Sequence, residues 1–198
     1  LKDGRVVIEL RPDLAPNHVA RIKQLTREKF YDGIVFHRVI EGFMAQTGDP
    51  TGTGMGGSKL PDLKAEFSSA KHVRGTLSMA RAGSPDSANS QFFICFKPSS
   101  FLDGQYTVWG QVVEGMELVD KIARGEPPVN PDKIISLKVA ADVDGKQAAP
   151  AAAATLPTVL DAAIRVPVVA EVANVVSNFR CVTCKADFKN SDEFHAHF

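Results

Sequence analysis

One charged side chain stands inside an otherwise apolar stretch of this sequence and could do chemistry at a surface. Arg38 lies between Phe36 and Ile40 in a run that predicts a β-strand, and strand alternation puts all three side chains on one face. On the next predicted strand, Met44 and Gln46 also share a face. An arginine and an amide beside apolar side chains are typical of a ligand-binding groove. A structural ion pair explains Arg38 equally well from the residues alone.

Two other patterns could carry chemistry, and both favour a structural interpretation. Gly52, Gly54 and Gly57 have the spacing of a dinucleotide-binding loop, but such a loop needs a helix directly after it, and Pro61 disfavours one there. We interpret residues 48–57 as a mobile surface loop. Cys95 lies in an apolar run and is predicted to be a core residue rather than a nucleophile. No Ser-His-Asp or Cys-His arrangement stands out.

A cysteine and histidine group occupies residues 179–198 and resembles a C2H2 zinc finger, with two residues between the cysteines and apolar residues at the expected spacing. The resemblance implies a small ββα unit with a structural zinc ion. Because a fourth ligand is expected about four residues beyond the first histidine, we expect the sequence to stop inside the finger. The implied ligands are Cys181, Cys184 and His197, with His195 as a substitute fourth ligand.

The charge balance argues against nucleic acid as a partner. The 198 residues contain 23 Lys and Arg against 23 Asp and Glu, so no overall attraction to phosphate is expected. In the finger-like segment, the positions that would read bases are Asn190, Glu193 and Ala196, which are poorly suited to a DNA groove. A structural or protein-binding role for this segment is favoured over DNA binding.

The composition argues against a membrane-spanning protein and indicates the compartment in which the chain works. No apolar stretch is long enough to span a membrane. Three cysteines cannot build a disulfide framework, which fits a reducing compartment. We therefore expect a cytoplasmic protein, or a periplasmic one if a leader preceding Leu1 has been removed.

The elements that would position these residues are mostly short strands. A tight-turn signal at residues 2–4 suggests that a strand before it is largely missing. Helices are predicted from residue 16 and over residues 115–125. Without alternating crossover helices the sheet cannot be mostly parallel, so a closed or sandwich-like β architecture is favoured. The predicted strands are residues 5–10, 34–40, 43–47, 76–80, 92–96, 106–113 and 134–143.

Four ordered blocks resemble the signature of the cyclophilin family of peptidyl-prolyl isomerases. They are residues 36–49 (FHRVIEGFMAQTGD), 75–81 (GTLSMAR), 89–94 (NSQFFI) and 101–104 (FLDG). The resemblance covers residues 1–143, and within the family the sequence is most similar to the bacterial branch. It implies a mainly β fold: a closed, antiparallel, eight-stranded barrel with two helices, its first strand largely missing. An Ala/Pro/Val-rich linker with short helical pieces (144–178) and the finger-like segment (179–198) would follow.

The resemblance also implies an activity and a site. The chain would catalyse cis/trans isomerisation of Xaa-Pro bonds in proline-containing polypeptides, assisting folding as a monomer without a cofactor. Arg38, Phe43 and Gln46 would form the catalytic set. The implied substrate-binding residues are Met44, Ala80, Arg81, Ala82, Gln91, Phe93, Phe101, Leu102 and Tyr106.

Three residues depart from the pattern of eukaryotic members. Arg81 stands where many have Asn, Phe101 where they have a Trp that contacts cyclosporin, and Tyr106 where they have a pocket His. We therefore expect weak cyclosporin binding. Two other classes stay open: a non-catalytic proline-peptide binder or chaperone, and a nucleic-acid-associated protein targeted by the finger. The intact set around Arg38 favours catalysis over the first, and the neutral charge disfavours the second.

Overall fold

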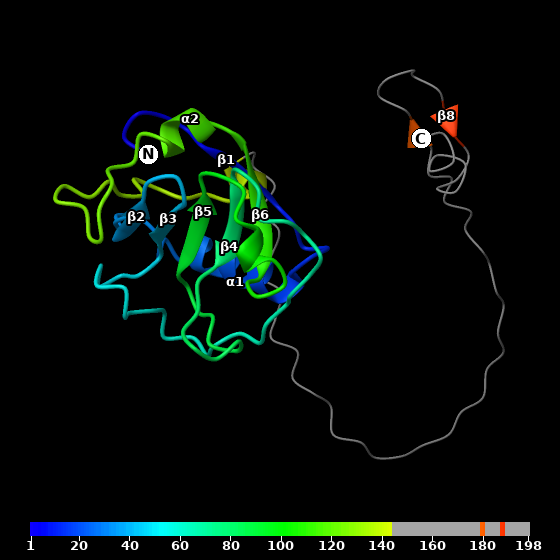
Figure 1. Ribbon diagram of the computed structural model, residues 1–198, viewed down its shortest axis with the longest axis horizontal. Coiled ribbons are helices and arrows are strands. Elements are labelled where there is room, and N and C mark those ends of the chain that lie inside the picture. Colours follow the sequence, from blue (N-terminus) through cyan, green and yellow to red (C-terminus); the bar gives the residue numbers. More distant parts are fainter. Residues whose placement is uncertain (144–178, 181–186, 189–198) are drawn as a thin grey trace, which may run out of the picture. The chain divides into compact units, whose positions relative to one another are not determined.

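The computed structural model describes residues 1–143, 179–180 and 187–188 (Figure 1). The chain divides into two compact units, Leu1–Pro150 and Ala151–Phe198. In the second unit, β7 (Phe179–Arg180) pairs antiparallel with β8 (Asp187–Phe188). Among the described residues, no helix has the length and apolar character that crossing a membrane requires.

An antiparallel sheet of six strands forms the body of the first unit, in the order β1-β6-β4-β5-β3-β2. Five of the predicted apolar runs thus form strands whose ends lie within two residues of the predicted ones, and a sixth forms a much shorter strand. The strands are β1 (Val7–Leu10), β2 (Arg38–Ile40), β3 (Met44–Thr47), β4 (Thr76–Met79), β5 (Phe92–Cys95) and β6 (Val108–Glu114).

The expected closed barrel of eight strands is wrong for the described residues, which form an open six-stranded sheet. The predicted strand over residues 134–143 is also absent. Ile134 makes isolated backbone hydrogen bonds with Gly33 and Ile34, and Ala140–Val143 forms the short helix α3. The chain beside β2 bonds only at separate points, such as Val39 with Gly125. Prolines between these points have no N–H to donate, so no continuous ladder forms. They are Pro127, Pro128 and Pro131.

Helix α1 (Pro16–Arg27) forms as predicted and covers one face of the sheet (Figure 1). Proline at its first turn is well tolerated, because that N–H has no helical partner. The Glu66 carboxylate caps this end by accepting hydrogen bonds from the backbone amides of Asn17 and His18, at 3.1 and 3.0 Å. The second predicted helix is much shorter: α2 spans only Met116–Val119.

The pleat of the central strands separates two apolar clusters. Phe92 and Ile94 of β5 belong to the large core that also contains the buried side chains of α1. Phe93 and Cys95 belong to a smaller cluster on the opposite face, together with Met44 and Leu102. Strand alternation therefore gives the sheet a second apolar surface, away from the helix.

The expectation that Phe36, Arg38 and Ile40 share one face is only partly right. Strand β2 begins at Arg38, so the alternation does not reach back to Phe36, which is buried in the main core. Ile40 instead packs against the smaller cluster. The short strand leaves Arg38 exposed beside that cluster.

Two buried histidines predict how stability depends on pH. Burial lowers the pKa of both His18 and His37 below the ordinary value of 6.5. The unfolded chain therefore takes up protons near pH 6.5 that the folded chain does not, and the free energy of unfolding should fall as the pH drops through this value. Urea titrations followed by the fluorescence of Trp109, at about pH 8 and about pH 5.5, measure this change above the carboxylate range. A free energy of unfolding that is the same or higher at about pH 5.5 than at about pH 8 would contradict the lowered pKa values of the two histidines.

Candidate active site

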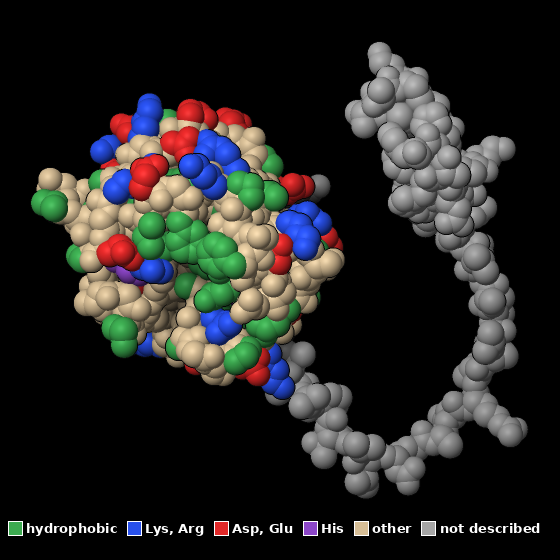
Figure 2. Space-filling view, viewed as in Figure 1, with side chains coloured by type: hydrophobic (Ala, Val, Ile, Leu, Met, Phe, Trp, Pro, Cys, Tyr) green, Lys and Arg blue, Asp and Glu red, His purple; other side chains and the backbone are tan. Residues whose placement is uncertain are grey.

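A groove of about 590 Å³ opens over the smaller apolar cluster, and the space-filling view shows a hollow beside a band of hydrophobic side chains (Figure 2). Strands β2 and β3, the chain after β4 and the glycine-rich segment all contribute to its walls. It is lined by His37, Arg38, Phe43, Met44, Gln46, Gly52, Thr53, Gly54, Ala80, Arg81, Phe93, Leu102, Tyr106, Glu126 and Pro127.

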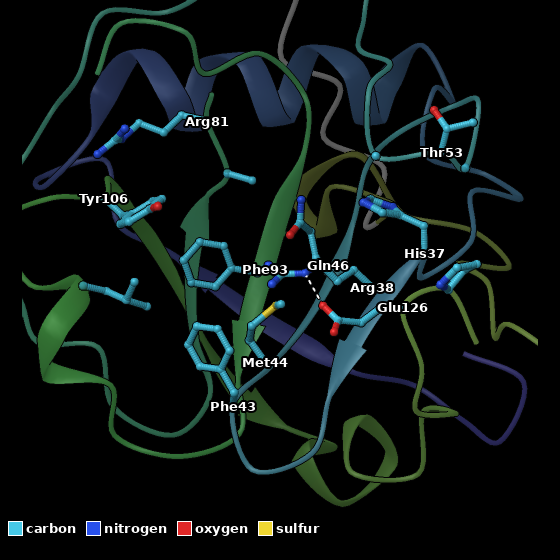
Figure 3. A pocket seen from close by; sticks show the side chains of 15 residues that line it. His37, Arg38, Phe43, Met44, Gln46, Thr53, Arg81, Phe93, Tyr106 and Glu126 are labelled. Atoms are coloured by element: carbon cyan, nitrogen blue, oxygen red, sulfur yellow. Dashed lines mark hydrogen bonds and ion pairs between the residues drawn. The ribbon is translucent and has the colours of Figure 1, made fainter. Parts of the chain in front are cut away.

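Arg38 is held in the groove by an acidic partner that the sequence analysis missed. Its Nε donates a hydrogen bond to Oε1 of Glu126 at 2.6 Å (Figure 3). Both side chains are about half exposed, at 45% and 52%. No other partner of the Arg38 guanidinium is found among the described residues, so its Nη groups are left free for a ligand. Glu126 lies 88 residues away in the chain, and no local pattern links it to Arg38.

Gln46 is oriented by a second amide. Strand pairing sets Gln46 opposite Arg38 on one side and opposite Phe93 on the other. Its Nε2 donates to Oε1 of Gln91 at 2.9 Å. The Gln91 amide donates in turn to the carbonyls of Gly54 and Gly56, at 2.9 and 2.8 Å. Gln91 therefore supports the groove wall rather than lining it.

The glycine-rich segment, expected to be a mobile surface loop, is tied to a buried carboxylate. Asp49 accepts hydrogen bonds from the backbone amides of Thr51, Gly54 and Gly56, at 2.7, 2.6 and 3.1 Å. Burial alone would raise the pKa of Asp49, but these amides and the Thr51 hydroxyl outweigh it and lower the pKa to about 2. Asp49 is therefore ionised at neutral pH and holds the segment against the groove.

His37 also lines this end of the groove, and it was not predicted as a site residue. It is buried, and burial lowers its pKa, so its imidazole is neutral at neutral pH. A Cβ added at Gly54 would lie 3.5 Å from the ring, which is ordinary contact, so the positive φ of 86° and not the space beside His37 favours glycine there.

The floor of the groove is aromatic and aliphatic. Phe93, Met44 and Leu102 are buried there. Tyr106 meets Phe93 edge-on, with ring centroids 5.7 Å apart. Phe101 packs on Phe43 at 5.4 Å but is 63% exposed, so it forms an outer rim and not part of the lining.

Cys95 lies beneath this floor. Burial raises the pKa of its thiol to about 12, so the side chain is neutral at physiological pH. This agrees with its prediction as a core residue.

Behind the floor lies a chain of polar groups that sequence inspection did not find. Asp103 Oδ1 lies 3.0 Å from His72 Nδ1, and His72 Nε2 lies 3.0 Å from Ser78 Oγ. Ser78 is fully buried and its hydroxyl donates to the Thr107 carbonyl, so it cannot act as a nucleophile. Instead, His72 stacks on Phe93, with ring planes 17° apart. The arrangement supports the floor.

All the predicted groove residues line the cavity except Ala82, Gln91 and Phe101. Ala82 lies beside it, where its carbonyl accepts a hydrogen bond from Arg81. The predicted metal ligands Cys181, Cys184, His195 and His197 lie outside the described residues. Within those residues no metal-binding cluster occurs.

The chain matches the family model of "Cyclophilin type peptidyl-prolyl cis-trans isomerase/CLD" over residues 1–139. It is 56% identical to a probable peptidyl-prolyl cis-trans isomerase of Brucella suis over 158 residues, covering 72% of this chain and 81% of the relative. It is 44% identical to peptidyl-prolyl cis-trans isomerase B of Bacillus subtilis, covering 64% of this chain and 89% of that protein.

Solved structures show the same similarity. Cyclophilin AquaCyp293 from Hirschia baltica is 32% identical with a TM-score of 0.62, covering 66% of this chain and 68% of that one. A cyclophilin type peptidyl-prolyl cis-trans isomerase from Cryptosporidium parvum, solved in the presence of the dipeptide Ala-Pro, is 31% identical with a TM-score of 0.63. The match covers 67% of this chain and 90% of that one.

Proposed function

Because the chain belongs to the cyclophilin-type peptidyl-prolyl cis-trans isomerases, we propose how its groove performs their reaction at a Xaa-Pro bond. The obstacle is conjugation of the peptide bond, which sets a rotation barrier of about 18–20 kcal/mol. Twisting the bond breaks this conjugation and returns a lone pair to the prolyl nitrogen. Bond rotation transfers no electrons or groups, so the reaction needs no cofactor.

Arg38 acts on that lone pair. Its Nε is occupied by Glu126, and its Nη groups donate a hydrogen bond to the prolyl nitrogen as the bond twists. The planar peptide offers no such acceptor, so the donor stabilises the twisted state more than either planar isomer. This held guanidinium beside an apolar floor is the observation that carries the proposal.

The remaining groove residues fix the two ends of the rotating bond. Phe93, Met44, Leu102 and Phe43 hold the proline ring, which is apolar and rigid. Gln46, whose amide is oriented by Gln91, binds the substrate backbone. One side of the bond is thus immobilised while the preceding carbonyl turns.

The substrates we propose are proline-containing segments of polypeptides, and the biological role is assistance in folding. The groove is open at the surface, so an extended chain can cross it. The related Cryptosporidium parvum structure was solved in the presence of Ala-Pro, which supports a ligand of this class.

Replacing Arg38 tests the mechanism. Arg38→Ala should lower kcat/KM by about a hundredfold, equal to about 2.7 kcal/mol of lost transition-state stabilisation. A protease-coupled assay with a Xaa-Pro peptide measures this. Arg11→Ala, which removes an arginine outside the groove paired with Asp13, is the matched control and should keep its activity. Near-wild-type activity in a folded Arg38→Ala variant would refute the role given to Arg38.

Cyclosporin should inhibit this enzyme more weakly than a eukaryotic member assayed beside it. Phe101 is exposed at the rim, but it has no indole N–H to donate to the drug. The variant Phe101→Trp should therefore be inhibited at lower cyclosporin concentrations. Tight inhibition of the unmodified enzyme that does not change in Phe101→Trp would contradict this.

We also propose a structural zinc site in the second unit, held by Cys181, Cys184 and His197, with His195 as the substitute fourth ligand. The pairing of Phe179 with Phe188, and of Arg180 with Asp187, supports it, because both cysteines fall between these paired residues in the sequence. Thiolate and imidazole are the ligands that zinc prefers. The ion would stabilise a small structural or protein-binding unit and would take no part in isomerisation.

Cobalt(II) titration of the full chain tests the zinc proposal. Thiolate-to-metal absorption bands should appear, and they should be lost when Cys181 and Cys184 are both replaced by Ser. Cys95→Ala is the control and should keep them, because Cys95 is buried in the first unit. Absence of the bands in the unmodified chain, or their persistence in the double variant, would refute the site.

A further inference from the structure

A second arginine lines the groove, and bond rotation does not require it. The guanidinium carbon of Arg81 lies 4.7 Å from the centroid of the Tyr106 ring. Figure 3 shows Arg81 above Tyr106, with Phe93 between this pair and Arg38. Arg81 therefore places a cation at the opposite end of the proline-binding floor from the catalytic donor.

Backbone carbonyls hold Arg81 in this position. Its Nε donates to the Gln105 carbonyl at 3.1 Å, and its Nη1 donates to the carbonyls of Ala82 and Gly83, at 3.0 and 3.3 Å. A guanidinium has five N–H donors, and Nη2 has no partner among the described residues. The side chain is thus oriented before a ligand arrives, and the Nη2 group stays available to donate hydrogen bonds to it.

The charge of Arg81 is uncompensated within the groove. Of the other ionisable lining residues, Arg38 is paired with Glu126 at 2.6 Å, and His37 is neutral because it is buried. Every hydrogen-bond acceptor of Arg81 in the described part of the chain is a carbonyl, and none is a carboxylate. This end of the groove therefore carries a net positive charge.

We propose that Arg81, held on Tyr106, selects substrates with an acidic side chain within two residues of the isomerised proline. The inference rests on the function proposed above, in which the proline lies on Phe93. The Tyr106 ring, on which Arg81 lies, contacts the Phe93 ring edge-on. Consecutive Cα atoms of a bound peptide are only about 3.8 Å apart. A Glu or Asp one or two positions from the proline therefore reaches the Nη2 group of Arg81 and supplies the missing negative charge.

The experiment compares peptides that differ in one charge. Four series carry Glu, Gln or Lys at one of the two positions before the proline or one of the two positions after it, and kcat/KM is measured for each. For an exposed pair we expect Glu to be preferred over Gln by about two- to fivefold in at least one series. The preference should shrink at about 0.5 M salt, where exposed charges are screened.

Variants assign the preference to Arg81. Arg81→Gln should bring the Glu-to-Gln ratio to about one, whereas Arg81→Lys, which keeps the charge, should retain part of it. Lys121→Gln removes the same charge from an exposed residue outside the groove lining and should leave the ratio unchanged. Urea titration checks that each variant is folded.

A Glu-to-Gln ratio of one in all four series for the unmodified enzyme would overturn the proposal. A ratio that persists in Arg81→Gln would do the same. The salt dependence of the unmodified enzyme tests the proposal even if a variant does not fold. Activity on the Gln peptides reports the isomerase function itself, so its loss would contradict the proposed function separately from the selectivity.

Discussion

The hydrogen bond from Nε of Arg38 to Glu126 decides what the groove can do. An arginine side chain loses up to about 2 kcal/mol of rotamer entropy when it is fixed, and an unheld guanidinium at the surface would turn toward water. Glu126 holds one edge of the planar head group and leaves the other edge for the substrate. Because the two residues come from different segments, the donor is positioned only after the chain beside β2 has docked at Val39 and Gly125.

The pleat of the sheet lets one strand contribute to both the hydrophobic core and the groove floor. In β5, Phe92 and Ile94 stabilise the core beneath α1, while Phe93 and Cys95 form the groove floor. The groups behind the groove are polar and hydrogen-bonded. Gln91 orients Gln46, Asp49 holds the glycine-rich segment, and His72 stacks behind Phe93. The floor can therefore stay rigid although one side of it faces solvent.

The sequence predicts local features of this structure well. The apolar runs that became β3 and β5 were found because their length and alternation are local, and the shared face of Met44 and Gln46 follows from the same alternation. The signature blocks identified the groove residues by resemblance. Glu126 and the Asp103–His72–Ser78 chain were missed because their partners meet only after folding. The closed barrel was wrong because prolines after Glu126 interrupt the hydrogen bonding that a further strand would need.

The central claim is that Arg38 accelerates rotation of the bound peptide rather than merely binding it. NMR exchange spectroscopy on an Ala-Pro peptide in the presence of enzyme measures cis/trans interconversion and peptide affinity in one titration. The account predicts that Arg38→Ala lowers the enzyme-dependent exchange far more than it weakens binding, with the dissociation constant changing by less than about tenfold, or about 1.4 kcal/mol. Exchange at the unmodified rate, or loss of binding that accounts for the whole loss of exchange, would contradict it.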